Sequence, residues 1–178
     1  HYILKEPHST WENYQVILGD QMYVNRGYRL SKIVKNGFSS LKILKQNIFA
    51  FKKENQNIKL HFDFFHGVGI LDNAIDVLDE KERNDFRKFV NTNKSFNREN
   101  MFICRSKKLM NEYFLSVFTW LEKCEQIFGF NLKGYAKTRV YTFLAERYIS
   151  YWFNKYSNPL CWPVFFFDTN KNKLNLRK

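Results

Sequence analysis

A glutamate stands inside an otherwise apolar run in the second half of the chain. Glu146 follows Phe143-Leu-Ala and directly precedes Arg147, and Arg139 lies seven residues before it. Seven residues are about two helical turns, so Arg139 and Glu146 share one face of a helix. A carboxylate in such surroundings either forms a structural pair with an arginine or accepts the proton of a substrate hydroxyl as a general base. The residues alone leave both interpretations open.

A second set of chemically capable side chains is His61-x-Asp63-x-x-His66. These are metal-ligand residue types, but their spacing fits no strong template and three phenylalanines surround them. The pattern favours an aromatic core cluster with hydrogen-bonded histidines over a metal site. His66 is the better candidate for contact with a ligand, because the adjacent Gly67 allows close approach.

Asp20 follows the apolar run Val16-Ile-Leu-Gly19, which predicts a buried strand over residues 14–20. Ligands of open α/β sheets bind beyond the carboxyl ends of strands, so Asp20 is a candidate metal or ribose ligand. The alternative is an aspartate that hydrogen-bonds its own backbone in a turn.

The elements that would position these groups alternate between helix and strand. Apolar periodicity predicts a helix after Ser39 or Ser40, whose inward positions are Leu41, Leu44, Ile48 and Phe51, and further helical segments over 71–89, 107–128 and 135–156. Ser106 and Gly129 are expected to cap the 107–128 helix. Strands are predicted over 101–104 and 164–167, and the type of 60–65 is ambiguous. The pattern predicts a mixed α/β fold with a helix-rich second half, in one domain over 1–178 with a loose basic tail at 171–178.

The charge is strongly positive and unevenly distributed. The 178 residues carry a formal charge of +12, and nine of the cations but only Glu54 among the acids lie within residues 26–59. Such a segment is either a solvated helix face or a contact for an anionic partner. No apolar run is long enough to span a membrane, and Cys104, Cys124 and Cys161 are expected to be buried thiols of a reducing compartment.

Three segments together resemble a known family. Asn100-Met-Phe-Ile-Cys followed by Arg-Ser-Lys-Lys, the block Arg139-Val-Tyr-Thr-Phe-Leu-Ala-Glu-Arg147, and Ser9-Thr-Trp-Glu-Asn13 are similar to motifs of the DUF4422 family. The resemblance implies a GT-A-like glycosyltransferase of bacterial capsule or lipopolysaccharide biosynthesis. The expected partners are a nucleotide sugar and a glycan or lipid-linked acceptor.

The resemblance also suggests roles for individual residues. It places Asn100 beside the donor sugar and Glu146 at the catalytic carboxylate, near a helix start, while Arg139 or Arg147 would balance developing charge. A divalent metal, Mn²⁺ or Mg²⁺, is expected with Asp20 as its candidate ligand, although the sequence has no Asp-x-Asp motif.

We expect a cytoplasmic enzyme whose 26–59 segment faces the anionic inner leaflet, and no nucleic-acid partner. The alternatives are a basic nucleic-acid binding module and a non-catalytic interaction domain of a larger transferase.

Overall fold

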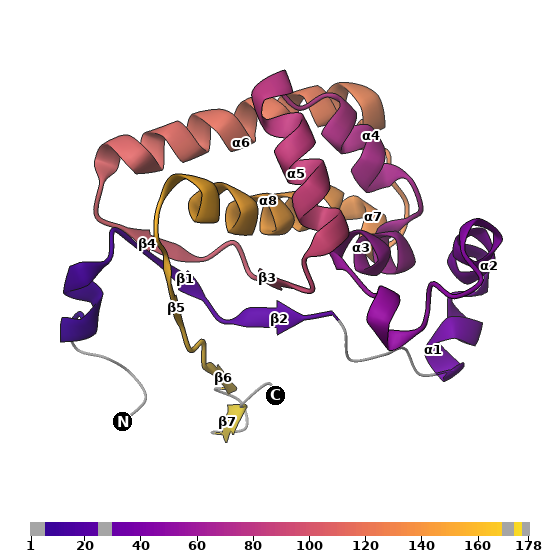
Figure 1. Ribbon diagram of the computed structural model, residues 1–178, viewed down its shortest axis with the longest axis horizontal. Coiled ribbons are helices and arrows are strands. Elements are labelled where there is room, and N and C mark those ends of the chain that lie inside the picture. The colour runs from indigo at the N-terminus through magenta and orange to yellow at the C-terminus, as the bar shows by residue number, and fades with distance from the viewer. Residues whose placement is uncertain (1–5, 25–29, 169–172, 176–178) are drawn as a thin grey trace.

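A three-stranded mixed sheet lies at the centre of the fold. The computed structural model describes residues 6–24, 30–168 and 173–175 (Figure 1). The central strand β1 (Val16–Gly19) pairs antiparallel with β4 (Phe102–Cys104) and parallel with β5 (Leu160–Trp162). In this register Ile17 lies opposite both Ile103 and Leu160, so these three residues point to the same face of the sheet.

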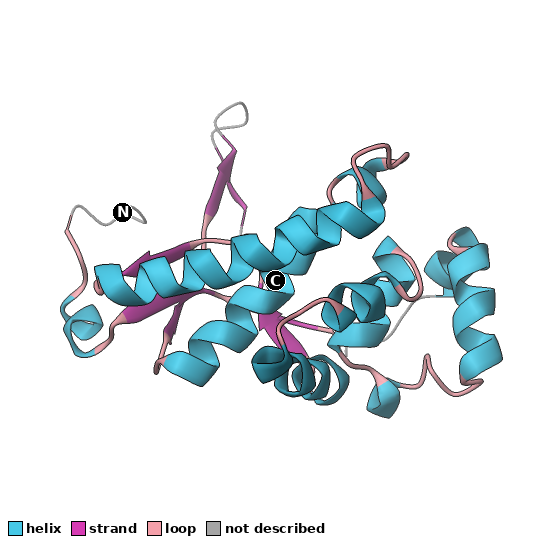
Figure 2. Cartoon of the chain, turned by 90° about the horizontal axis from the view of Figure 1, so that it is seen from above, coloured by secondary structure: helices cyan, strands magenta, loops and turns pink. Residues whose placement is uncertain are grey.

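One face of this sheet is covered by the two longest helices, α6 (Lys107–Phe128) and α8 (Val140–Tyr156) (Figures 1 and 2). Val16 and Leu18 point into this layer and belong to the main core cluster. Alternation along β1 sends Ile17 and Gly19 to the opposite face, where Ile103 of β4 is 51% exposed. Only the face of the sheet that α6 and α8 cover therefore belongs to the main core cluster.

Further helices extend the core next to the short antiparallel pair of β2 (Gln21–Tyr23) and β3 (Ser95–Asn97). They are α3 (Ile58–His66), α4 (Ile70–Asp76) and α5 (Glu80–Thr92), and the one-turn helix α7 (Tyr135–Thr138) precedes α8. Phe62, Leu71 and Phe86 bring these helices into the same core cluster. A short pair, β6 (Phe166–Asp168) with β7 (Lys173–Asn175), follows β5.

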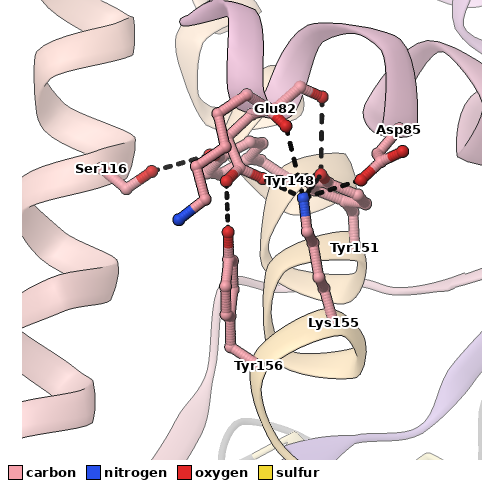
Figure 3. Close-up of polar contacts among 8 residues, drawn as sticks. Glu82, Asp85, Ser116, Tyr148, Tyr151, Lys155 and Tyr156 are labelled. Carbon is pink, nitrogen blue, oxygen red and sulfur yellow. Dashed lines mark hydrogen bonds and ion pairs between the residues drawn. The ribbon is translucent and has the colours of Figure 1, made fainter.

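A buried carboxylate connects α5 to α8 (Figure 3). Glu82 accepts hydrogen bonds from the Tyr151 hydroxyl at 2.6 Å, from the Tyr156 hydroxyl, and from Lys155 Nζ at 3.2 Å. Lys155 also pairs with Asp85 at 2.8 Å. Burial raises the pKa of Glu82, but the three donors outweigh that effect and leave its pKa below the usual range.

The mixed α/β class and the helix-rich second half are as the sequence predicted. Ser106 accepts the backbone N–H of Leu109 and caps α6, which ends before Gly129 at φ 60°. The ambiguous 60–65 segment is helical, and 71–89 divides into α4 and α5. The closing strand expected at 164–167 begins only at Phe166, as β6, and the strand β5 at Leu160–Trp162 was not predicted.

The remaining helices, α1 (Leu30–Lys35) and α2 (Gly37–Gln46), lie at one end of the molecule with the single turn η2 (Lys53–Asn55) (Figure 1). The turn η1 (Ser9–Asn13) lies near the N-terminus. The predicted inward face of the helix after Ser40 is wrong. α2 ends at Gln46 and buries Ser40 and Ile43, whereas Leu41 and Ile48 are exposed.

Two other expectations need correction or lie outside the described residues. Of the three thiols only Cys124 is buried, although all three are free, as expected. Most of the 171–178 tail lies outside the described part of the chain, and its residues 173–175 form β7 rather than a loose end. Arg26 and Arg29 of the basic segment also lie outside the described residues.

Candidate active site around Glu146

The Glu146 carboxylate sits in the second turn of α8, at the boundary between core and solvent. Its side chain is 14% exposed, and its Oε2 lies 2.9 Å from Nη1 of Arg147. Its Oε1 accepts the backbone N–H of Glu99 at 3.4 Å. α8 begins at Val140, so Glu146 is farther along the helix than the family resemblance implied.

The loop that contacts Glu146 has an unusual backbone. Glu99 and Asn100 both have positive φ, at 81° and 46°, which is uncommon for residues with a Cβ. The Asn100 Nδ2 group donates to the carbonyl oxygen of Thr142 at 3.0 Å and ties this turn to α8. Asn100 Oδ1 is buried and accepts no hydrogen bond from the described part of the protein. Strained backbone and an unused acceptor beside a carboxylate are typical of functional sites.

Arg147 lies beneath Glu146 in the core, with 1% of its surface exposed. Its Nη1 also donates to the Phe143 carbonyl at 3.1 Å, and its Nη2 lies 3.3 Å from Nδ1 of His61. The guanidinium carbon is 4.2 Å from the centre of the Phe96 ring, a cation–π distance. Burial lowers the pKa of Arg147 to about 10, against the opposing effect of Glu146, so the group is still a cation at neutral pH. Arg147 thus fixes Glu146 in place and is too deep to contact a substrate directly.

The environment of Glu146 makes it a better base than an ordinary glutamate. Burial raises its pKa and outweighs the opposing effects of Arg147, the Glu99 N–H and Arg139. A carboxylate whose pKa is raised above its ordinary value and that still reaches solvent is a candidate to accept a proton from a substrate.

Arg139 and His66 both contact the ring of Phe143, which lies one turn before Glu146 on α8. Arg139 is exposed, precedes α8, and places its guanidinium 5.5 Å from the centre of the Phe143 ring. It also donates to the hydroxyl of Tyr135. The His66 ring stacks on Phe143 with centroids 4.0 Å apart, but His66 is only 8% exposed. The structure therefore brings Asn100, Arg139 and Arg147 to Glu146, with Arg139 the exposed cation, whereas the buried His66 is connected to this region only through Phe143.

The three polar residues of the His61-x-Asp63-x-x-His66 motif contact different partners and do not form one site. Asp63 binds Lys59 at 2.6 Å and the Gly69 N–H at 3.2 Å, while His61 contacts Arg147 and His66 stacks on Phe143. The expected aromatic cluster is confirmed, and within it His61 is hydrogen-bonded to Arg147, whereas His66 packs against aromatic rings.

Asp20 does not gather the donors that a metal ion needs. It is exposed at the end of β1, and within the described ranges no three His, Cys, Asp or Glu side chains are close enough to hold an ion. A single carboxylate can hold Mn²⁺ or Mg²⁺ only together with donors from a substrate, such as phosphate oxygens, so no step is derived through a metal here.

A large apolar pocket opens beside this region, on the sheet face opposite α6 and α8. Its volume is about 670 Å³, and it is lined by Trp11, Ile17, Leu18, Gly19, Met101, Phe102, Ile103, Trp162, Pro163, Val164 and Phe165. Met101 follows Asn100 directly. The backbone N–H of Glu99 contacts Glu146 Oε1, and Met101 is only two residues farther along the chain. The Cα atom of Met101 therefore lies within about 13 Å of Glu146 Oε1.

Two contributors to the site were not identified from the sequence. They are the backbone N–H of Glu99 and the ring of His61, which orient Glu146 and Arg147. The run Asn97-Arg-Glu-Asn100 carries a signal for the first, because asparagine tolerates left-handed turns. No local signal points to the contact between His61 and Arg147.

In the part of the chain that the structure describes, no helix is both long and apolar enough to cross a membrane. The chain has no significant match among curated proteins or solved structures. A family model described as a domain of unknown function, DUF4422, matches residues 21–158, which include all of the segment from Glu99 to Arg147. The chain therefore belongs to the DUF4422 family.

Proposed function

We propose that the protein is a glycosyltransferase that moves a sugar from a nucleotide-sugar donor to an acceptor of surface-polysaccharide biosynthesis, a capsule or lipopolysaccharide glycan. The observation that carries this proposal is the Glu146 carboxylate. It is partly exposed, its pKa is raised, and it is held between a buried arginine and a turn with two left-handed residues. Residues with this combination are candidates for general acid–base chemistry.

In the proposed reaction Glu146 accepts the proton of an acceptor hydroxyl. The freed oxygen forms a bond to the anomeric carbon of the donor sugar while the bond from that carbon to the phosphate oxygen breaks. The nucleoside diphosphate leaves with the electron pair. Arg139 is exposed and close enough to Glu146 to influence its pKa, so its charge can stabilise the leaving phosphate.

Three other groups orient the reactants. Asn100 lies in the turn whose backbone contacts Glu146, and we assign it to the donor sugar, as the family resemblance implies. Arg147 and His66 hold Glu146 and Phe143 from below and act as positioning residues. The apolar pocket beyond Met101 offers no charged side chain, which suits the hydrocarbon part of a lipid-linked acceptor. The proposal places the enzyme at the cytoplasmic side of the membrane, where nucleotide sugars and such acceptors meet.

The test is a transfer assay with a panel of nucleotide sugars and lipid-linked glycan acceptors. We expect one donor to give acceptor-dependent release of nucleoside diphosphate together with labelled product. Nucleoside diphosphate release that is equally fast with the Glu146→Gln variant would remove the catalytic assignment.

A further inference from the structure

The end of the molecule formed by α1, α2 and the loop to η2 exposes large apolar side chains. We call residues 34–53 the basic tip. Phe38 is 76% exposed and Ile48 is 72% exposed, and the other exposed apolar side chains of the tip are Val34, Leu41 and Phe49. This end lies away from the sheet in both views of the ribbon (Figures 1 and 2). A cluster of apolar side chains this exposed indicates an interaction surface.

The two faces of α2 differ sharply. Its inward face packs through Ile43, which lies in a small cluster with Ala50 and Phe64, and through Ser40, whose hydroxyl donates to the Ile33 carbonyl at 2.8 Å. Its outward positions are Phe38, Leu41, Lys42 and Lys45, which follow i, i+3, i+4 and i+7 spacing and form one stripe. The stripe therefore presents apolar and cationic groups together on the side that no described element covers.

Lysines surround the exposed apolar groups. Lys42 Nζ lies 4.6 Å from the centre of the Phe38 ring, and Lys52 Nζ lies 4.4 Å from that of Phe49. Lys35, Lys45 and Lys53 add three more cations, and the tip contains no Asp or Glu. Among the ion pairs of the described residues none includes a lysine of the tip, so all five charges are available to an external anion.

We infer that the basic tip docks on an anionic bilayer surface. Phe38, Leu41 and Ile48 enter the boundary between headgroups and acyl chains, and the lysines bind the lipid phosphates. Charge complementarity selects the anionic leaflet, and the apolar side chains favour a bilayer over a nucleic acid, because a phosphate backbone gains nothing from exposed aliphatic groups. This surface is separate from Glu146 and does not depend on the proposed reaction.

The experiment measures co-sedimentation of the protein with phosphatidylcholine vesicles, with and without phosphatidylglycerol. One variant combines Phe38→Ser with Leu41→Ser, and a second combines Lys42→Gln with Lys45→Gln. The matched controls change exposed residues of the same types on α6, namely Leu115→Ser with Phe118→Ser, and Lys107→Gln with Lys108→Gln.

We expect binding to the anionic vesicles alone, at least about tenfold weaker partitioning for each tip variant, and no change for either control. Circular dichroism verifies that every variant is folded. Equal binding to neutral and anionic vesicles would overturn the inference, as would tip variants that bind like the controls.

A competition with single-stranded RNA distinguishes membrane binding by the basic tip from nucleic-acid binding. If RNA displaces the vesicles and only the lysine variant loses binding, the tip is a nucleic-acid contact and the inference is wrong. The Glu146→Gln variant should bind vesicles like the wild type. Vesicle binding without sugar transfer by the wild type would therefore reject the proposed reaction and leave this inference standing.

Discussion

Glu146 and Arg147 are neighbours in the chain and form an ion pair of 2.9 Å, yet the side chain of Glu146 is 14% exposed and that of Arg147 is 2% exposed. The pair therefore has an inner member held by Phe143, His61 and Phe96, and an outer member that can meet a substrate. The sequence left open whether this pair is structural or catalytic. From the difference in exposure we assign the structural role to Arg147 and the catalytic role to Glu146, so we expect the two residues to respond differently to substitution.

The Glu146→Gln substitution should reduce sugar transfer by about 10²–10⁴-fold, the usual contribution of a general base. Glutamine keeps the shape and can still accept the Glu99 N–H, but it leaves the buried Arg147 cation without its carboxylate, so we also expect a loss of about 1–3 kcal/mol in the free energy of unfolding. Transfer rates and thermal unfolding measured on the same preparation check this. A folded variant with near-normal transfer would show that Glu146 is only a structural partner of Arg147.

The rate of transfer should depend on the protonation of Glu146. Because burial raises the pKa of this carboxyl above its ordinary value of 4.5, the rate should fall with decreasing pH at a midpoint above 4.5. A profile of kcat/KM against pH measures this midpoint. An acidic limb at or below pH 4.5 would contradict the assignment of Glu146 as the base.

Removal of the inner partner should cost stability. Arg147→Ala leaves the partly exposed Glu146 carboxylate without its cation, empties the buried space of the arginine side chain and removes the packing against Phe96, so we expect a loss of about 3–5 kcal/mol in the free energy of unfolding. Arg139→Ala changes an exposed cation and should cost less than about 1 kcal/mol. Urea denaturation compares the two variants, and equal losses would show that burial does not distinguish these arginines.

The link between Glu82 and α8 should make stability depend on pH in the acidic range. Glu82 has a lowered pKa in the folded protein, so its contribution is present above the unfolded value of 4.5 and is lost as pH falls through the folded pKa. At pH 7 the Glu82→Gln variant should be about 1–3 kcal/mol less stable than the wild type, because the Lys155 ion pair and two tyrosine hydrogen bonds to a charged acceptor are changed.

That difference should narrow as pH falls below 4.5. Urea denaturation at several pH values gives the comparison, and Glu80→Gln, an exposed neighbour on α5, is the control. A difference between wild type and Glu82→Gln that stays constant across the acidic range would show that the Glu82 charge does not contribute to stability.

The sequence by itself determined the local parts of this fold. Long apolar periodicity and the flanking Ser106 and Gly129 were enough to predict α6, because helix propensity and capping act within a few residues. The periodicity was less able to specify which face is buried. Leu109 and Tyr113 are buried, whereas Met110 and Phe114, which are apolar at the same spacing, are only partly buried. Local pattern cannot distinguish two such stripes.

Tertiary structure decided the features that depend on distant contacts. The parallel strand β5 pairs with β1 across more than a hundred residues, and three residues give too short a pattern to predict. The outward face of α2 carries Phe38 and Leu41 because the helix packs through Ser40 against α1 and through Ile43 against Phe64 of α3. The sequence singled out Glu146 because a charge in an apolar run is costly. Only the fold places Arg147 below it and the Glu99–Asn100 turn beside it, because those contacts join α8 to a loop more than forty residues away.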